Sequence, residues 1–168
     1  GEVSRQMFAS YTIDAITNGV HVPTWTSPPF RELFDTYIEG WRSDNFSLKG
    51  MINVPTQEVW QAHRQAKDRL LSYINRETNA GFDRETLTLG FARRFAAYKR
   101  PDLLLFDVER LKHICRSVGP IQIVYSGKAH PADDVGREMI RTILRTTEQL
   151  RGQVRMAFLP NYGMEMGK

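Results

Sequence analysis

Four cations are concentrated in the stretch Gly90-Phe-Ala-Arg-Arg-Phe-Ala-Ala-Tyr-Lys-Arg100. They are Arg93, Arg94, Lys99 and Arg100. Guanidinium and ammonium groups in such a cluster suit the binding of phosphate, which an Arg fork can hold at two points. A solvated basic loop is the alternative interpretation. The segments on either side favour an anion site, because they predict a strand before the cations and a helix after them.

The apolar run 86–91 carries no charge on either face, which indicates a strand buried on both sides, as in a parallel sheet. Pro101 suits a first helical turn, and a helix is predicted from there to about residue 119. Apolar residues recur in it at helical spacing: Leu104, Val108, Leu111 and Cys115. In open α/β sheets, ligands bind at the carboxyl ends of strands, beside helix N-termini that favour anions. The four cations therefore fall where an anion is expected.

The order of strand, polar loop and helix is repeated along the rest of the chain. Further strands are predicted at 121–125 and 154–159, and the loops that follow them are 126–131 and 160–163. The helix between these strands has apolar residues predicted to face inwards: Val135, Met139, Ile140, Ile143, Leu144 and Leu150. The spacing of the strand starts matches a βαβ unit, whose right-handed crossover gives a parallel sheet. The loops after all three strands are expected at one rim of that sheet.

Residues 1–85 are predicted to form an irregular and helical N-terminal part, and residues 86–168 the first βαβαβ units, within one structural domain. The first part is expected to contain a short strand at 11–17, a helix from Pro28 capped by Ser27, a loop at 41–55 and a longer helix at 56–79. An apolar stripe marks the first of these helices: Phe30, Leu33, Phe34, Tyr37, Ile38 and Trp41. His63 falls on the apolar face of the second and is predicted to be a core histidine.

Length and composition limit the class of protein. A chain of 168 residues has the size of one ordinary domain. Its 23 Lys and Arg against 19 Asp and Glu give a net charge of +4, a mild preference for anionic ligands and not a nucleic-acid signature. Cys115 is the only cysteine and is predicted to be a core thiol, which suits a reducing cytoplasm.

Neither a signal peptide nor a long apolar span is recognised, so no membrane association is expected. Residues 164–168 resemble a helix that is cut off, and the chain is therefore expected to be a fragment.

Other chemistries find little support in the sequence. The segment Ser126-Gly-Lys128 lacks the glycine spacing of a P-loop, and no GxGxxG motif marks a dinucleotide site. The histidines are scattered without a close pair, so no metal site is predicted. Asp133 and Asp134 are assigned to the first turn of a helix and not to a glycosidase acid pair. Spacing alone supports no Ser-His-Asp arrangement.

Four motifs together resemble the α-glucan phosphorylases, the family of glycogen and maltodextrin phosphorylases, and most closely its shorter bacterial and archaeal type. In chain order they are Thr17-Asn-Gly-Val-His-Val-Pro-Thr-Trp25, Gly90-Phe-Ala-Arg-Arg-Phe-Ala-Ala-Tyr-Lys-Arg100, Ser126-Gly-Lys-Ala-His-Pro131 and Phe158-Leu-Pro-Asn-Tyr162. The resemblance covers nearly the whole chain. It implies an α/β fold, the Rossmann-like parallel sheet with flanking helices of an incomplete C-terminal lobe of a GT-B glycosyltransferase.

The resemblance also implies an activity and a cofactor. Enzymes of this family transfer a terminal α-1,4-linked glucosyl unit from an α-glucan to inorganic phosphate and release glucose 1-phosphate. They use pyridoxal 5′-phosphate, whose phosphate takes part in the proton transfer. By resemblance, Arg94 and Lys99 would be the catalytic pair that holds substrate phosphate. Further residues would contact the substrate, namely Asn18, His21, Lys128 and His130, or the cofactor, namely Arg93, Trp25, Tyr162 and Gly163. A cytoplasmic enzyme is expected, and the resemblance allows a homo-oligomer.

The sequence departs from the family in one important respect. The lysine that carries the cofactor belongs to a glycine-rich motif that is not found here. Among the lysines present, Lys67 and Lys112 are predicted on the solvent side of helices and Lys128 at the rim, so the chain alone is expected to be inactive. Two alternatives stay open: a nucleotide-sugar glycosyltransferase such as a glycogen synthase, and a non-catalytic α/β module with an anion pocket. The loop at 91–100 and the lack of a recognisable nucleoside-binding acidic residue argue against the first.

Overall fold

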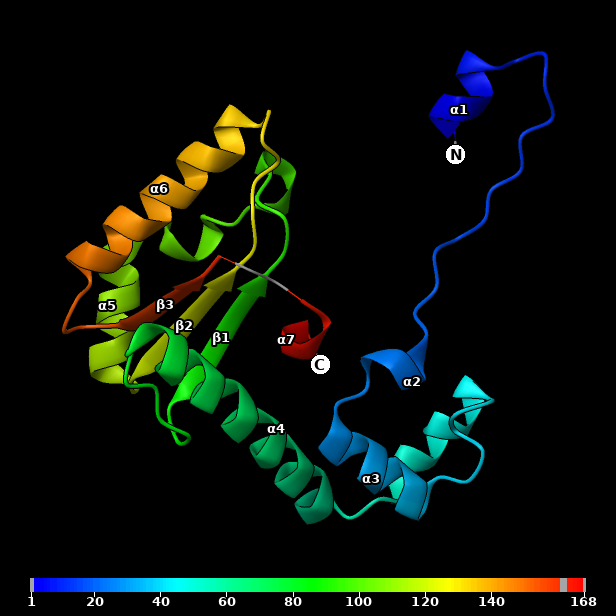
Figure 1. The fold of residues 1–168 in the computed structure, drawn as a ribbon, viewed down its shortest axis with the longest axis horizontal. Helices are drawn as coiled ribbons and strands as arrows, with labels where there is room; N and C mark the ends of the chain where they lie inside the picture. Colours follow the sequence, from blue (N-terminus) through cyan, green and yellow to red (C-terminus); the bar gives the residue numbers. More distant parts are fainter. Residues whose placement is uncertain (1, 161–162, 168) are drawn as a thin grey trace.

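A three-stranded parallel sheet forms the centre of the structure (Figure 1). The computed structural model describes residues 2–160 and 163–167. The strands are β1 (Leu87–Ala92), β2 (Ile121–Ser126) and β3 (Arg155–Leu159), in the order β1-β2-β3. Phe91 pairs with Tyr125 and Tyr125 with Phe158, so the carboxyl ends of the strands share one edge. The common rim is thus confirmed for the loops after β1 and β2, whereas residues 161 and 162 of the third loop lie outside the described residues.

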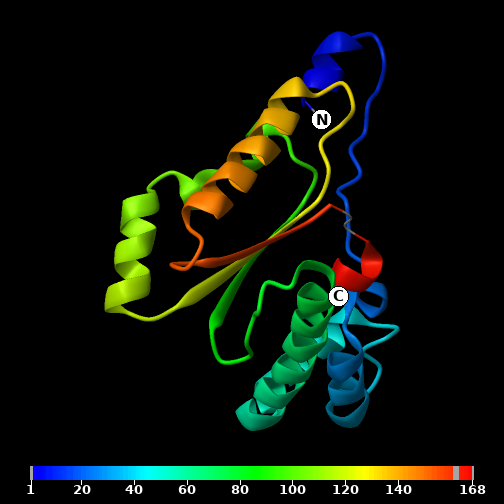
Figure 2. The same cartoon turned by 60° about the vertical axis from the view of Figure 1, so that its left-hand side comes forward.

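Helices cover both faces of the sheet, which confirms the α/β class (Figures 1 and 2). The connecting helices α5 (Val108–Ser117) and α6 (Asp134–Gln149) lie on one face, and α4 (Thr56–Thr78) lies on the other. Successive side chains of a strand point to opposite faces, so β2 and β3 contribute to two cores. The core under α5 and α6 contains Phe95, Leu111, Ile123, Tyr125, Ile143, Leu150 and Val154. The core under α4 contains Leu71, Ile74, Phe82, Val124, Ala157 and Leu159.

A third core lies between α3 (Pro28–Tyr37) and the first half of α4. Its largest member is Trp41, which is only 2% exposed. The indole N–H donates to Asp35 at 2.9 Å, and Arg42 donates to both oxygens of the same carboxylate. The hydrogen bonds from Arg42, and to a smaller extent the one from Trp41, hold the pKa of Asp35 below its usual value. The predicted apolar stripe is confirmed except at Tyr37, which is 44% exposed.

Two predictions for the N-terminal part are wrong. Residues 12–20, where the sequence predicts most of a strand, have no regular secondary structure, and Ile16 is almost fully exposed. They belong to an arm that runs from α1 (Glu2–Met7) to α2 (Val22–Trp25) away from the sheet, so no described strand lies beside them (Figure 1). The predicted loop at 41–55 contains a 3-10 helix, η1 (Asn45–Asn53), because the side chain of Asp44 accepts from the backbone N–H of Phe46 and caps its start.

The helix predicted from Pro101 begins at Val108 instead. Arg100 has a left-handed backbone with φ 51°, which ends the short helix η2 (Ala97–Lys99). A second short helix, η3 (Leu103–Leu105), follows before α5. The start of α5 is fixed by Asp107, whose side chain accepts from the N–H of Arg110 at 2.9 Å. The cations therefore do not belong to the first turn of α5, and the helix-dipole part of the predicted anion site is wrong.

Two side chains on α4 have surroundings that differ from those predicted. His63 is exposed, because Ala62 and not His63 faces the third core. Lys67 is not a free solvent-side lysine, since its ammonium group donates to the carbonyls of Arg84 and Thr86 at 2.6 and 2.7 Å. These two hydrogen bonds fasten α4 to the segment that leads into β1.

The two connecting helices agree better with the sequence. Cys115 is partly buried against the core under α5 and α6, which confirms the core thiol. Along α6, Ile143 and Leu150 are buried as predicted, whereas Val135 and Leu144 are exposed because the buried stripe is narrower than the run of apolar residues. The final helix, α7, spans Met164–Gly167. Within the described ranges, no helix has the length and apolar character needed to cross a bilayer.

Candidate anion-binding site

The basic loop, residues 93–100, starts as a continuation of β1. The N–H of Arg93 donates to the carbonyl of Ser126 at 3.2 Å, and the N–H of Phe95 donates to the carbonyl of Lys128 at 2.9 Å. Phe95 and Ala129 form a parallel bridge beyond the ends of the strands. The ring of Phe95 is fully buried in the core under α5 and α6. The first half of the basic loop is therefore fixed to the loop that follows β2.

Two glycines allow the basic loop to approach its neighbours closely. Gly127 has φ +142°, and a Cβ at this position would overlap the carbonyl oxygen of Arg93. A Cβ at Gly136, in the first turn of α6, would lie 2.6 Å from the carbonyl oxygen of Phe95. A side chain at either position would displace the loop. The backbone path of Arg93 and Phe95 thus depends on glycine in two neighbouring segments.

The four cations of the basic loop form no ion pair with any carboxylate in the part of the chain that the structure describes. Arginines elsewhere are often paired, as Arg42 is with Asp35 at 2.7 Å. Arg93, Arg94 and Arg100 are exposed, and Lys99 is half-buried. A group of positive charges without counter-charges attracts anions. The basic loop is therefore a local centre of positive potential at the carboxyl edge of the sheet.

Tyr98 lies between two of these cations, although the sequence analysis assigns it no role. The ammonium nitrogen of Lys99 is 4.7 Å from the centroid of the Tyr98 ring. A hydrogen bond with Arg94 is the main cause that holds the pKa of the Tyr98 phenol below its usual value, and the charge of Lys99 acts in the same direction. The phenol thus connects Arg94 and Lys99. Its position between them in the sequence is the signal that could have revealed it.

A cavity of about 520 Å³ opens beside the basic loop. Arg93, Lys99 and Arg100 reach it, whereas Arg94 is not among the residues that line it. The rest of its lining comes from β1, β2 and the segment after the loop: Leu89, Gly90, Phe91, Pro101, Leu103, Leu104, Ile123 and Tyr125. Burial, with a smaller contribution from the charge of Asp102, raises the pKa of Tyr125 to about 12, so this phenol stays neutral at physiological pH. An apolar lining beside cations suits a ligand with a flat apolar body and an anionic group.

The loop after β2 brings two more predicted residues to the same edge. Lys128 is exposed, and its carbonyl is the one bonded to Phe95. The Nδ1 atom of His130 accepts from the backbone N–H of Ala132 at 3.1 Å, which leaves Nε2 of the neutral ring as its donor. Asp133 caps α6 by accepting from the N–H of Gly136 at 2.8 Å. Asp133 is therefore the N-cap and Asp134 the first residue of α6, so of the pair predicted in the first turn only Asp134 belongs to it.

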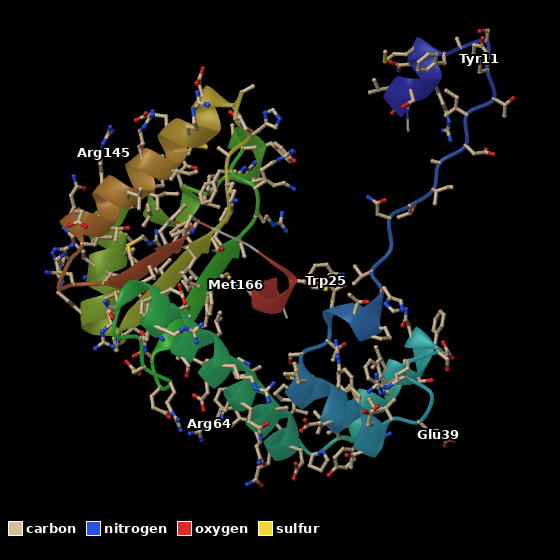
Figure 3. The ribbon with its side chains drawn as sticks, viewed as in Figure 1. Tyr11, Trp25, Glu39, Arg64, Arg145 and Met166 are labelled. Carbon is tan, nitrogen blue, oxygen red and sulfur yellow. The ribbon has the colours of Figure 1, made fainter. Side chains whose placement is uncertain are left out.

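The N-terminal residues assigned to the site lie apart from the basic loop. Asn18 is in the arm before α2, and Nδ1 of His21 is 2.6 Å from the hydroxyl oxygen of Thr24. Trp25 is 42% exposed in α2, and Tyr11 marks the distant end of the arm (Figure 3). No hydrogen bond or ion pair joins the described residues of this arm to the basic loop. Gly163 is exposed just before α7, and Tyr162 lies outside the described residues.

The parallel sheet and its cationic edge define an α/β protein with a positively charged rim, and comparison with known proteins gives the family. The sequence profile of the carbohydrate phosphorylases matches residues 5–168. The chain belongs to the carbohydrate phosphorylase family.

Individual relatives agree with this assignment. The chain is 38% identical to glycogen phosphorylase of Aquifex aeolicus, over 96% of the chain and 27% of that protein. It is 36% identical to maltodextrin phosphorylase of Thermococcus litoralis, over 90% of the chain and 20% of that protein. Glycogen phosphorylase of Mycobacterium tuberculosis is 34% identical over the whole chain, which corresponds to 23% of its length. The chain thus spans about a quarter of the length of these relatives.

Proposed function

We propose that this chain supplies the phosphate-binding part of an α-glucan phosphorylase. In that enzyme a terminal α-1,4-linked glucosyl unit passes from an α-glucan to inorganic phosphate, and glucose 1-phosphate is released. The observation that carries the proposal is the group of four cations without carboxylate partners, within the described chain, at the carboxyl edge of a parallel sheet. Relatives that are named for glycogen and maltodextrin support the glucan as substrate.

Arg94 and Lys99 are proposed to hold substrate phosphate. Both interact with Tyr98, which keeps the two cations near one point. A dianion placed there meets one planar fork and one ammonium group, and hydrogen bonds between charged partners are the strong ones. The cations also hold the phosphate against the glucosyl carbon. There its oxygen forms the new bond while the bond to the O4 atom of the departing glucan breaks and that oxygen takes up a proton.

Pyridoxal 5′-phosphate is the proposed cofactor, and the residues present fit part of it. The cavity offers an apolar lining for a flat ring, and Arg93 at its rim carries a positive charge for the phosphate. When bound, the cofactor supplies a phosphate group that takes part in proton transfer. Trp25, Tyr162 and Gly163 are proposed as further contacts of the cofactor. The attachment lysine is not assigned to any residue of this chain.

The remaining assignments concern the substrate. Asn18 and His21 are proposed to contact the glucosyl unit, and Lys128 and His130 are proposed to lie on the substrate side of the rim. His130 fits this role because its Nδ1 accepts from the backbone N–H of Ala132, which leaves the Nε2–H of the neutral ring as a donor for a ligand. For Asn18 and His21 to reach the rim, the arm before α2 must lie closer to the sheet in the working enzyme than it does in this structure.

The phosphate dependence of glucose 1-phosphate release tests the proposal. In the full-length enzyme that carries this chain, Arg94→Ala and Lys99→Ala should each raise the phosphate concentration for half-maximal rate about 10- to 100-fold, since a charged hydrogen bond contributes about 1.5–3 kcal/mol. Glucan affinity should change little. Arg145→Ala is the matched control, because Arg145 is an exposed arginine on α6, paired with Glu138 and distant from the loop (Figure 3). Unchanged phosphate dependence in both variants would contradict the proposal. So would an enzyme that takes its glucosyl unit from a nucleotide sugar and does not use phosphate as acceptor.

A further inference from the structure

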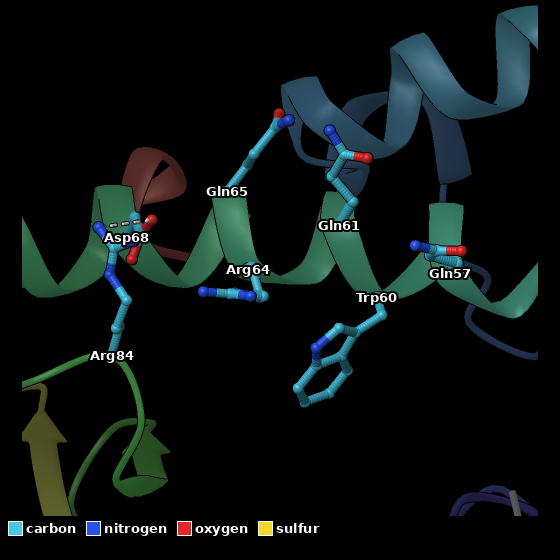
Figure 4. A pocket seen from close by; sticks show the side chains of 7 residues that line it. All are labelled: Gln57, Trp60, Gln61, Arg64, Gln65, Asp68 and Arg84. Carbon is cyan, nitrogen blue, oxygen red and sulfur yellow. Dashed lines mark ion pairs between the residues drawn. The ribbon is translucent and has the colours of Figure 1, made fainter.

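Two concave surfaces of the molecule differ in what their polar side chains require. A groove of about 370 Å³ follows α4, and Figure 4 shows Arg84 of this groove beside Asp68, with which it pairs at 3.4 Å. Trp60 and the remaining side chains of the groove are exposed, so water can meet their polar groups. The cavity beside the basic loop is different, because its lining contains a buried hydroxyl group, that of Tyr125.

The aromatic ring of Tyr125 is fixed by its neighbours in the sheet. Tyr125 lies near the end of β2 and is only 1% exposed. The centroid of its ring is 5.8 Å from that of Phe91 and 6.5 Å from that of Phe95. Side chains that are packed in a core in this way keep one rotamer on average. The position of the Tyr125 hydroxyl group is therefore set by the core under α5 and α6.

This hydroxyl group forms no hydrogen bond with any residue in the ranges 2–160 and 163–167. A buried tyrosine hydroxyl group usually has a partner, because burial without one costs free energy. The oxygen is not enclosed by protein atoms either, since the one enclosed side-chain nitrogen or oxygen without a partner in these ranges is Nε of Arg31. The oxygen of Tyr125 thus borders open space, and the space that Tyr125 lines is the cavity.

The hydroxyl group of Tyr125 differs in chemistry from the rest of the cavity lining. Among the described residues that line the cavity, the charged side chains are Arg93, Lys99 and Arg100, and all the others except Tyr125 are apolar or glycine. A ligand in the cavity therefore meets cations and a single uncharged donor. Such a lining suits a molecule with an anionic group and a flat body that carries an uncharged acceptor.

The charge of Asp102 indicates which part of a ligand Tyr125 contacts. Burial, and to a smaller extent the charge of Asp102, raises the pKa of Tyr125 to about 12, so the hydroxyl group keeps its proton and can donate it to a hydrogen bond. The same negative charge repels a phosphate beside the hydroxyl group, whereas the cations of the lining attract one. The hydroxyl group is thus left for an uncharged acceptor.

We propose that Tyr125 is a further contact of the cofactor and donates a hydrogen bond from its hydroxyl group to an uncharged polar atom of the pyridine ring. The identity of the ligand rests on the proposed function, whereas the unpartnered donor in the cavity rests on the structure alone. A contact between Arg93 and the cofactor phosphate leaves the ring free to turn. A second contact on the ring removes this freedom and fixes the orientation of the cofactor.

Reconstitution of the full-length apoenzyme with pyridoxal 5′-phosphate tests the inference. Tyr125→Phe keeps the ring and removes only the hydroxyl group, and it should weaken cofactor binding about three- to tenfold, the range of one uncharged hydrogen bond. The absorption spectrum of the bound cofactor should also change, because the acceptor atom belongs to the ring that absorbs. The melting temperature of the apoenzyme should not fall, because the hydroxyl group has no protein partner to lose.

Tyr73→Phe is the matched control. Tyr73 is a partly buried tyrosine that packs against the core under α4 and does not line the cavity. Its variant loses a hydroxyl group as well and should bind the cofactor as the wild type does. Equal weakening in both variants would overturn the inference, because the effect would then not belong to the cavity.

Wild-type affinity and an unchanged spectrum in Tyr125→Phe would also overturn the inference and would show that only water meets the hydroxyl group. A lower melting temperature of the Tyr125→Phe apoenzyme would do the same, because the hydroxyl group would then have a protein partner in the full-length enzyme. Failure of the proposed function is a distinct result. An enzyme that binds the cofactor but releases no glucose 1-phosphate still measures the Tyr125 contact, whereas a wild type that binds no cofactor refutes both.

Discussion

The side chain of Gln122 and the backbone of Asp83 exchange two hydrogen bonds, although 39 residues separate them in the sequence. The amide nitrogen donates to the carbonyl of Asp83 at 2.7 Å, and the amide oxygen accepts from its N–H at 3.1 Å. The same amide nitrogen donates to the hydroxyl of Thr88 at 2.8 Å. Gln122 is fully buried at the start of β2, so it joins the segment before β1 to the interior of the sheet.

Replacing Gln122 with Leu should destabilise the protein measurably. The N–H and carbonyl of Asp83 would lose their partners in a part-buried place, and a buried unsatisfied group costs about 1–3 kcal/mol. Chemical denaturation of the full-length protein measures the change in the free energy of unfolding. Gln153→Leu is the control, because Gln153 is exposed. A Gln122→Leu variant as stable as wild type would show that water replaces the amide without loss.

Asp83 should make stability depend on acidic pH. Hydrogen bonds from the hydroxyl and N–H of Thr86, followed by those from Arg155 and the N–H of Glu85, lower the pKa of Asp83 from 3.8 to about 2. Because the folded-state pKa is lowered, the stabilisation is complete above about pH 4 and is lost as the pH falls towards 2. Asp83→Asn should therefore lower the melting temperature at pH 7 and match wild type more closely near pH 2.5. A difference that is constant across this pH range would contradict the prediction.

Gly127→Ala should damage phosphate binding more than a substitution at another glycine with positive φ. The new methyl group would overlap the carbonyl oxygen of Arg93 and displace the start of the basic loop. Gly152→Ala is the matched control, because Gly152 also has positive φ, at +82°, but has no heavy atom within 4 Å of an added Cβ. Both variants carry backbone strain, so only the clash separates them. Phosphate dependence of the full-length enzyme is the measurement, and equal effects in both variants would refute the role of Gly127.

The chain alone should form no stoichiometric adduct with pyridoxal 5′-phosphate after borohydride reduction. Such an adduct requires a neutral amine that is shielded from water. Lys67 donates to two carbonyls, Lys112 pairs with Glu109 at 2.8 Å, and Lys99 lies over Tyr98. Lys128 is exposed at the rim, and Lys168 lies outside the described residues. Intact mass measures the product, with Lys128→Arg as a control for random labelling. A single adduct at one lysine would place the cofactor attachment in this chain.

The sequence predicts the strands well because each strand is indicated by a short apolar run of neighbouring residues. The runs at 121–125 and 154–159 are apolar and short, and the structure confirms both strands within a residue. The backbone conformation of a single residue is harder to predict. Pro101 is compatible with a first helical turn, but Arg100 has a left-handed backbone, and α5 begins only after its cap at Asp107. No sequence pattern indicates that an arginine will have a positive φ.

Contacts between distant segments limit prediction of the site. The positions of Arg93 and Lys128 near one edge follow from parallel pairing and are predictable. The bond between Arg94 and Tyr98 depends on the fold of η2, which no periodicity indicates. His63 is wrongly assigned to a core because α4 serves two cores in turn, and a single helical stripe does not describe such a helix.

The backbone hydrogen bonds from Arg93 to Ser126 and from Phe95 to Lys128 also bear on the kinetics of the proposed phosphate binding. A loop that must become ordered around an anion loses conformational entropy at each encounter, about 1–2 kcal/mol per residue. The start of this loop is ordered by the sheet before any ligand arrives. Association of phosphate should therefore be limited by diffusion and electrostatic attraction, with a rate constant that falls as ionic strength rises and shows little dependence on loop motion.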